Sequence, residues 1–408
     1  MKILLISHLI PYPPRGGCSL RNYNLIKECS RNHEIYMVSF YRKTHVRGDI
    51  SLDDSIREMK KYCKDVKVFK IPSEHNRLLW YLMLILNLFS LAPYSAWMYH
   101  SSAMIKAVKN MIKQYKFDVM EIGEIGLLKY ARYAPSIPKV LVHHNIESQL
   151  LFRRSRAAKN PLAKLYLAIQ AYKLKRYERL AGDNIDYHTT VSQIDKETLL
   201  RINSKANIAV IPNGVDTEYF KPMDIPIEKN NLVFVGGMSW LPNLDAMVYF
   251  KDEIWPLLKA RVPDIKMTVI GAGPSRELIN YSKRDPMFQV KGFVDDVRPF
   301  IAKAAVYVVP IRIGGGTRLK ILDAMAMGKA IVSMSIGCEG IEAVDGKDII
   351  VADEPEVFAE KIIALLTDEQ RRQSIEKSAR QNVENKYAWG KIGPHLEDVY
   401  YKLAKKEH

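Results

Sequence analysis

The segment that most constrains the fold of this chain lies between residues 304 and 332. The apolar run AAVYVVPIR, residues 304–312, predicts a buried parallel strand. Three consecutive glycines follow it, and then comes a helical pattern whose apolar positions are Leu319, Leu322, Met325 and Ala326. Gly328 has the position of a helix C′ residue, and the β-branched pair Ile331 and Val332 begins another strand. Strand, glycine loop, helix and strand in this order are typical of a doubly wound α/β sheet.

The glycine loop has the features of an anion site. Gly314, Gly315 and Gly316 remove every Cβ where the backbone enters the helix, so an anion can approach free N–H groups and the positive helix end. Thr317 is the expected N-cap. Such loops are also common in α/β proteins that bind no nucleotide. The loop alone therefore does not distinguish a nucleotide site from an ordinary strand-to-helix turn.

Charged residues continue the pattern on the helix. Lys320 and Asp323 share the helix face opposite the apolar positions. Arg318 and Asp323 are separated by about 7 Å along the axis, close to the distance between a nucleotide's diphosphate and its ribose hydroxyls. Cations near the loop and a carboxylate one turn later suit that ligand.

Length and charge indicate two domains with different surroundings. The chain has 408 residues, 48% of them hydrophobic and 26% charged, and about two domains is the usual expectation. Residues 1–200 carry 32 Lys/Arg against 17 Asp/Glu, whereas residues 201–408 carry 29 against 28. This asymmetry predicts that the first half faces an anionic membrane surface or a polyanion. Nucleic acid is not the expected partner, because zinc-finger spacings, recognition-helix patterns and single-strand motifs are missing from the sequence.

The cysteines and the N-terminus indicate a cytoplasmic protein. Four cysteines occur without metal-binding or redox spacing, as expected in a reducing compartment. The opening MKILLISHLIPYPP lacks a cleavage site and runs into prolines, so we expect a first strand instead of a signal peptide.

Strands and helical segments alternate along the first half. The expected strands are residues 2–7, 34–40, 66–71, 119–122, 140–143 and 186–191. Gly16 and Gly17 follow the first of them and lead into a helix, without the dinucleotide fingerprint G-x-G-x-x-G. Their simplest interpretation is a helix entry. Ligands of parallel sheets lie at the carboxyl ends of strands, and His143, His144 and Asn145 fall at one such end, although a single histidine is more often structural.

Two segments of the first half could contact a membrane. Residues 78–91, LLWYLMLILNLFSL, are too few to span a bilayer, so they form either a buried core helix, the simpler interpretation, or a helix in the lipid interface. Residues 153–179 carry nine Lys/Arg beside a single acidic residue, Glu178, with an apolar stripe of Leu162, Leu165, Tyr166 and Ile169. A basic amphipathic helix suits an anionic surface, and a solvated helix face is the alternative.

The second half repeats the alternation. Strands are expected at residues 231–235, 266–270, 288–291 and 305–310, and a helix is expected from about residue 242 to 261. We therefore expect a first domain over residues 1–207, a linker over 208–228 and a second domain over 229–385. Residues 386–408 are expected to form a helix that crosses back to the first domain.

The motifs, taken together in order, resemble those of the retaining glycosyltransferase family 4. They are Gly16–Gly17, His144, the segment IPNGVD (residues 211–216), FVGG (234–237), Gly271–Gly273, GFVDD (292–296) and residues 314–332. The resemblance covers nearly the whole chain and implies the GT-B fold, in which two doubly wound Rossmann-like domains face a central cleft.

The resemblance also implies roles for particular residues. Gly16 and Gly17 would approach the donor phosphate and the acceptor, and His144 would contact the transferred sugar. Phe293 and Val294 would line the base pocket. Asp323 stands at the second Glu of the family's E-x7-E pattern and would bind the ribose hydroxyls.

The chain departs from the family pattern at three positions. Gly315 replaces the first Glu, and Gly237 and Pro242 replace the usual Arg and Lys. We expect Arg318 and Lys320 to supply the missing positive charge, with the amides from Gly314 to Thr317 completing the phosphate site. Glu339 is a candidate to replace the lost carboxylate.

These features predict a metal-independent retaining glycosyltransferase. It would use a UDP- or GDP-type sugar as substrate and no cofactor, because helix dipole and cations stabilise the departing diphosphate. The acceptor would be a glycan, expected to be lipid-linked at the inner face of the plasma membrane. A nucleotide-sugar epimerase or hydrolase of the same fold and a catalytically silent membrane scaffold are the alternatives.

Overall fold

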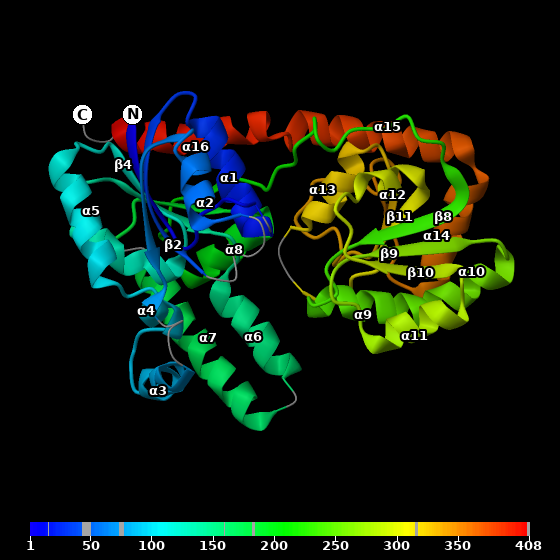
Figure 1. The fold of residues 1–408 in the computed structure, drawn as a ribbon, viewed down its shortest axis with the longest axis horizontal. Helices are drawn as coiled ribbons and strands as arrows, with labels where there is room; N and C mark the ends of the chain where they lie inside the picture. Colours follow the sequence, from blue (N-terminus) through cyan, green and yellow to red (C-terminus); the bar gives the residue numbers. More distant parts are fainter. Residues whose placement is uncertain are drawn as a thin grey trace. The chain divides into compact units, whose positions relative to one another are not determined.

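The computed structural model describes residues 1–14, 16–42, 50–72, 77–158, 160–181, 184–314 and 317–405. Its contacts divide the chain into two compact units, each built on one parallel sheet (Figure 1). The first unit contains Met1–Pro212 and Ile392–His408, and the second contains Asn213–Lys391.

The first unit has a seven-stranded sheet in the order β3-β2-β1-β4-β5-β6-β7. Its strands are β1 Lys2–Ser7, β2 Glu34–Tyr41, β3 Cys63–Lys70, β4 Val119–Ile122, β5 Lys139–His143, β6 Tyr187–Thr190 and β7 Ile208–Val210. Its helices are α1 Gly17–Cys29, α2 Leu52–Met59, α3 Arg77–Leu88, α4 Tyr94–Met98, α5 Ser102–Gln114, the 3-10 helix η2 Ile125–Tyr133, α6 Glu147–Ala157, α7 Pro161–Ala181 and α8 Gln193–Ile202. The last helix, α16 Trp389–Ala404, ends in this unit.

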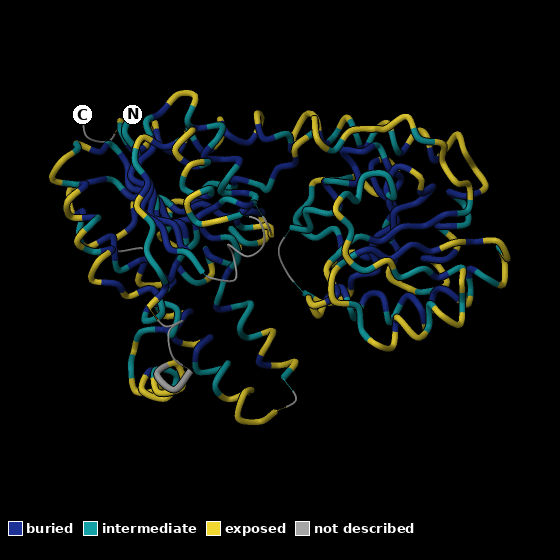
Figure 2. Tube along the Cα trace, viewed as in Figure 1, coloured by how far each residue is buried: buried dark blue, intermediate teal, exposed yellow. Residues whose placement is uncertain are grey.

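Alternation along β1 distributes its side chains to two cores. Leu4 and Ile6 pack with residues of α5, η2 and α7 on one face of the sheet. Ile3 and Leu5 point to the other face, where they meet α1 and α16. The central strands of this sheet are therefore buried on both sides, as Figure 2 shows in dark blue, whereas the edge strand β3 has exposed residues.

The second unit has a six-stranded sheet in the order β10-β9-β8-β11-β12-β13. Its strands are β8 Glu228–Val235, β9 Lys266–Ile270, β10 Phe288–Gly292, β11 Ala304–Val309, β12 Ala330–Ser333 and β13 Ile350–Val351. Its helices are α9 Leu241–Tyr249, the π-helical turn η3 Phe250–Ile254, α10 Trp255–Arg261, α11 Arg276–Arg284, α12 Arg298–Lys303, α13 Leu319–Ala326, α14 Pro355–Thr367 and α15 Glu369–Lys386.

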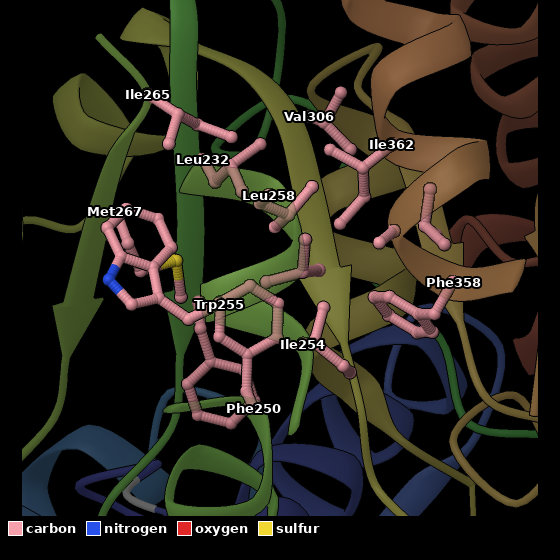
Figure 3. Packing of buried hydrophobic residues seen from close by; sticks show 14 of the residues in the cluster. Leu232, Phe250, Ile254, Trp255, Leu258, Ile265, Met267, Val306, Phe358 and Ile362 are labelled. Carbon is pink, nitrogen blue, oxygen red and sulfur yellow. The ribbon is translucent and has the colours of Figure 1, made fainter. Parts of the chain in front are cut away.

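Two hydrophobic clusters sandwich this second sheet. On one face, Phe250, Trp255 and Leu258 pack with Phe358 and Ile362 of α14 against alternate residues of the strands (Figure 3). On the other face, residues of α12, α13 and α15 cover the remaining strand residues. The central strands β11 and β12 are buried on both faces, so they appear in the sequence as continuous apolar runs.

The sequence predicts the parallel α/β architecture correctly, and the strands at 119–122 and 266–270 have the expected bounds. Two details are wrong. Strand β7 lies inside the segment expected to be a linker. The helix expected from 242 to 261 contains a π turn, because Pro256 has no N–H to continue the α-helical hydrogen bonds.

The prediction of a buried core helix at residues 78–91 is wrong. Helix α3 exposes a run of apolar side chains, including Tyr81, Ile85 and Leu86, which are 56–57% exposed. Phe89, directly after the helix, is 88% exposed. Among the described residues, every helix falls short of the length and apolarity that a bilayer-spanning segment needs.

Candidate functional site

The second unit's candidate site is built around the beginning of α13. The helix starts at Leu319, one residue later than a Thr317 N-cap would place it, and Arg318 occupies the N-cap position without a side-chain cap. The Thr317 prediction is therefore wrong. The end of the helix was predicted correctly, because Gly328 has a φ of 62° and Lys329 N–H donates to the Ala324 carbonyl, which is a Schellman ending.

Lys320 reaches from α13 to the loop that follows β8. Its Nζ donates to Asn243 Oδ1 at 2.7 Å and lies 4.1 Å from the centre of the Phe234 ring. Asn243 Nδ2 donates in turn to the Gly237 carbonyl at 2.8 Å. Gly236 makes this approach possible, because a Cβ there would lie 2.8 Å from Asn243 Nδ2 and closer still to Lys320 Nζ.

Asp323 lies one turn further along α13, and both Asp323 and Lys320 are half-buried. Burial raises the pKa of Asp323 to about 7, and the nearby Lys320 opposes this shift. Burial lowers the pKa of Lys320 to about 7, with Arg318 acting in the same direction and Asp323 against it. Desolvation therefore outweighs the attraction between the two charges. Tyr307 of β11 is buried here, and burial together with Asp323 raises the pKa of its hydroxyl.

Three glycine turns join the strand ends beside this pair. Gly236 N–H donates to the Ile270 carbonyl, and Gly271 N–H donates to the Gly292 carbonyl, both at 2.8 Å. Gly271 has a φ of 152°, and a Cβ on it would collide with the Gly236 carbonyl. The motifs FVGG, Gly271–Gly273 and GFVDD thus become neighbours at the carboxyl ends of β8, β9 and β10.

The cations around the glycine loop have different partners. Arg318 Nη2 lies so near Gly314 that a Cβ on this glycine would be 2.7 Å away. Arg312 also precedes the loop, but its guanidinium makes a bidentate pair with Asp245, at 2.9 and 3.0 Å. Arg312 is not among the cations, Arg318 and Lys320, that the sequence predicts to supply positive charge at this loop.

The other residues of this unit that were predicted to bind the sugar donor differ in their exposure. Phe293 follows β10 and is 74% exposed, while the half-buried Val294 packs against the cluster beneath α12 and α13. A Cβ on Gly237 would contact nothing within 4 Å. Glu339 is half-buried in the turn after β12. Gly315 and Gly316 lie outside the described residues.

The first unit places His144 at the carboxyl end of β5. Its ring lies 6.0 Å from that of His8, which follows β1, and burial holds the pKa of His144 well below its usual range. His143 points elsewhere, since its Nε2 lies 3.0 Å from His188 Nδ1 in a buried stacked pair. Gly16 is the exposed N-cap of α1 with a φ of 97°, and Gly17 begins that helix.

Sequence reasoning missed Asn243 and Tyr307, although both lie against the predicted pair. Asn243 had a usable signal, because it lies near the start of the helix that follows the Gly236–Gly237 turn. Tyr307 had none, since a tyrosine inside an apolar strand is indistinguishable from a core residue.

The fold and the motif order define a class. Two α/β units with parallel sheets are found in glycosyltransferase structures of the GT-B type. One is sucrose-phosphate synthase from Thermosynechococcus elongatus, with a TM-score of 0.71, 13% identity and full coverage of both chains. Another is Anabaena Alr3699/HepE in complex with UDP, with a TM-score of 0.67, 14% identity and coverage of 98% of this chain and 100% of that one.

Sequence comparison gives the family. Residues 15–219 match the family described as Glycosyltransferase Family 4, and residues 229–368 match Glycosyl transferases group 1. The chain therefore belongs to glycosyltransferase family 4 and is a glycosyltransferase with the GT-B fold.

Several curated bacterial proteins are similar in sequence to this chain. An uncharacterized 44.6 kDa protein in the cps region of Klebsiella pneumoniae is 22% identical, covering 89% of this chain and 90% of its own length. Phosphatidyl-myo-inositol mannosyltransferase of Mycolicibacterium smegmatis is 28% identical over 47% of this chain and 50% of its own length. Lipopolysaccharide 1,2-N-acetylglucosaminetransferase of Salmonella typhimurium is 25% identical over 64% and 71%.

The close approach at Gly236 gives a prediction about stability. Gly236→Ala should lower the free energy of unfolding of the second unit by about 1–3 kcal/mol, because the new methyl displaces Lys320 and Asn243. Gly237→Ala is the matched control and should change it by less than about 1 kcal/mol, because its methyl has room. Urea unfolding measures both, and equal losses would contradict the packing described around Gly236.

Proposed function

We propose that this chain is a metal-independent retaining glycosyltransferase that moves a sugar from a UDP- or GDP-type donor to a lipid-linked glycan. The observation that carries the proposal is the Lys320–Asp323 pair on α13, which is half-buried beside the glycine turns of the second unit. Holding two charged groups in partly desolvated positions costs stability, and a nucleotide diphosphate would provide interactions that offset this cost.

Lys320 would act on the diphosphate. In the protein alone, burial holds the pKa of its ammonium near 7, so that about half of it is charged at neutral pH. A diphosphate beside it would favour the charged form, and that charge is most valuable when the leaving group develops negative charge. Arg318 and the amides of the loop would share this task, in place of the Arg and Lys that the family usually has.

Asp323 would hold the nucleoside. Its carboxylate lies one turn beyond Lys320, and two ribose hydroxyls could donate to it. Phe293 and Val294, which follow β10, would then line the base. His144 of the first unit would contact the transferred sugar, and Gly16 and Gly17 would leave room for the phosphate and the acceptor.

Retention of configuration would follow from attack on the face that the diphosphate leaves. The departing phosphate would take the acceptor's proton, so the reaction needs neither a protein nucleophile nor a metal. HepE complexes with UDP and with UDP-glucose support a nucleotide sugar as donor. The phosphatidylinositol and lipopolysaccharide named for the relatives support a lipid-linked acceptor in the synthesis of cell-surface polysaccharide or glycolipid.

A membrane contact is part of the proposal. Asn87, at the end of α3, accepts from Gln170 of α7 at 2.8 Å, so α3 is fixed to the helical hairpin of α6 and α7. The exposed apolar side chains of α3 and the following segment are Trp80, Tyr81, Leu82, Ile85, Leu86, Leu88, Phe89 and Leu91, and α7 adds Leu162, Leu165 and Tyr172. We define these residues as the apolar surface of the first unit.

Charge and exposure favour an anionic bilayer on the cytoplasmic side as the partner of this surface. Exposed Lys and Arg accompany it on α6 and α7, among them Arg156, Lys164 and Lys175. Lys173 is buried instead and donates to the Leu88 carbonyl, so one of the nine basic residues supports the fold. Such an apolar and basic mixture is typical of interfacial binding.

Donor turnover tests the central proposal. A panel of UDP- and GDP-sugars, assayed for released nucleotide with and without a lipid-linked acceptor, should give acceptor-dependent release of one nucleotide with chelator present. Asp323→Ala should weaken donor binding by about 1.5–3 kcal/mol for each lost bond. Release that needs no acceptor would identify a hydrolase, and no release with any donor would favour the silent scaffold.

The half-buried pair also predicts the pH dependence of donor binding. Lys320 must be protonated to bind the diphosphate. Its contribution to donor affinity is therefore greatest below its pKa of about 7, and donor affinity falls about tenfold per pH unit above that value. Asp323 must be ionised to accept from the hydroxyls, so affinity is full above its pKa of about 7 and falls below it. Calorimetry with an intact nucleotide sugar should therefore give a maximum near pH 7.

Two variants separate the limbs of this profile. Lys320→Arg should flatten the alkaline limb, because a guanidinium stays charged, and Asp323→Asn should flatten the acid limb. Lys303→Arg, an exposed change on α12, is the matched control and should leave the profile unaltered. A profile that is flat between pH 6 and 8 in the unmodified protein would contradict the assigned roles.

Liposome cosedimentation tests the membrane contact. Binding should require anionic lipid and fall with salt, with each engaged Lys or Arg contributing about 1 kcal/mol. Replacing Phe89 and Leu91 with Ser should remove the salt-resistant part of binding, whereas Ile279→Ser, on α11 of the second unit, should not. Equal and negligible binding to neutral and anionic liposomes would favour a soluble acceptor.

A further inference from the structure

Three potential metal ligands meet at the carboxyl edge of the first unit's sheet. His8 follows β1, Cys18 lies in the first turn of α1, and His144 follows β5. One ligand atom from each residue lies within 4.8 Å of the other two, and Cys18 Sγ is 3.7 Å from His8 Nε2. Two ligands of a tetrahedral zinc ion are separated by about 3.3–3.6 Å, so small side-chain rotations would bring the three atoms onto one ion.

Each histidine has a second nitrogen with a candidate partner nearby. His8 Nδ1 lies 3.5 Å from Glu124 Oε2, and a backbone hydrogen bond with Gly123 acts on the ring of His144. His144 Nε2 is buried without a hydrogen-bond partner. Metal-binding histidines usually hold their other nitrogen on a carboxylate or a backbone carbonyl. His144 has such a backbone partner, and a small rotation of His8 would bring its Nδ1 into hydrogen-bond distance of Glu124.

The charged groups around the three ligands have both signs, and the guanidinium of Arg21 also acts on His144. The carboxyl groups of Glu124 and Glu147 act on Cys18, and the guanidinium of Arg21 opposes them there. Arg42 acts on His8, where its charge disfavours a protonated ring. Both imidazoles are neutral at pH 7, because burial lowers their pKa values, so each ring has a free lone pair.

A different use of the same residues, a reactive thiolate paired with an imidazolium, does not fit. Burial raises the pKa of the Cys18 thiol and lowers that of His8 to about 4, so the pair is neutral. A nucleophilic cysteine needs the opposite shifts. A metal ion can still bind, because coordination itself removes the thiol proton.

We propose that His8, Cys18 and His144 form a binding site for Zn²⁺, with a fourth position open to water. One thiolate and two imidazoles are borderline-soft ligands that zinc prefers, and three protein ligands leave the coordination incomplete. The ion would be coordinated by the His144 nitrogen that otherwise faces the proposed donor-sugar site. If the proposed function is right, zinc would therefore inhibit glycosyl transfer, and this consequence alone rests on that function.

Titration of the full-length protein with Co²⁺, after removal of metals with chelator, tests the site without any assay of activity. A thiolate-to-cobalt charge-transfer band should appear at one equivalent and vanish when Zn²⁺ is added. Cys18→Ser should abolish the band and weaken Zn²⁺ binding by at least about 100-fold, the upper range for losing an outer partner of a metal ligand. Glu124→Gln should weaken it by about tenfold and retain the band.

Controls keep the result interpretable. Cys338→Ser removes a half-buried thiol of the second unit and should change nothing, and thermal melting should show that each variant is folded. Absence of the band in the unmodified protein, or equal Zn²⁺ affinity in Cys18→Ser, would overturn the proposal. If the protein binds zinc but turns over no donor, the proposed function is refuted and the zinc site stands. If zinc inhibits turnover by the unmodified protein but not by Cys18→Ser, the result supports the zinc site and the proposed function.

Discussion

Both units depend on one constraint, which is that every strand pair in their sheets is parallel. All strands of a sheet then end at the same edge, and the chain must cross over a face before each new strand. The order reverses between β1 and β4 in one sheet and between β8 and β11 in the other. Connections leave such a point in opposite directions, so the edge of the sheet is uncovered there. His8 follows β1 at one of these points, and the helix with Lys320 and Asp323 follows β11 at the other.

The second unit holds two charged groups in partly desolvated positions at that edge. Lys320 and Asp323 are half-buried, and desolvation shifts the pKa of each toward 7 against their mutual attraction. Asn243 and the Phe234 ring offset part of the desolvation of Lys320. Apolar side chains in these positions would avoid this cost, so the stability of the fold alone does not explain the charged pair.

The sequence predicted the parallel architecture because continuous apolar runs and glycine turns are local signals. It could not predict the exposure of α3. A helix that is apolar on all sides shows the same sequence pattern in a protein core as at a lipid surface. The short strand β7 depends on its pairing with β6. Tyr307 joins the site only through packing, whereas Lys320 and Asp323 were visible because they belong to one helix.

The two sheet edges also differ in the sign of the charge they favour. In the second unit, the glycine turns, Arg318 and Lys320 present donors and positive charge, which suit a phosphate. In the first unit, neutral imidazoles and a thiol lie beside Glu124 and Glu147, and burial raises the pKa of both carboxyls to about 7. Neutral lone pairs beside these carboxyl groups favour a cation or a hydroxyl-rich sugar over another anion, although the guanidiniums of Arg21 and Arg42 act against a cation there. One topology therefore provides two sheet edges of different chemistry, because the fold determines only where the strand ends meet and the side chains determine what can bind there.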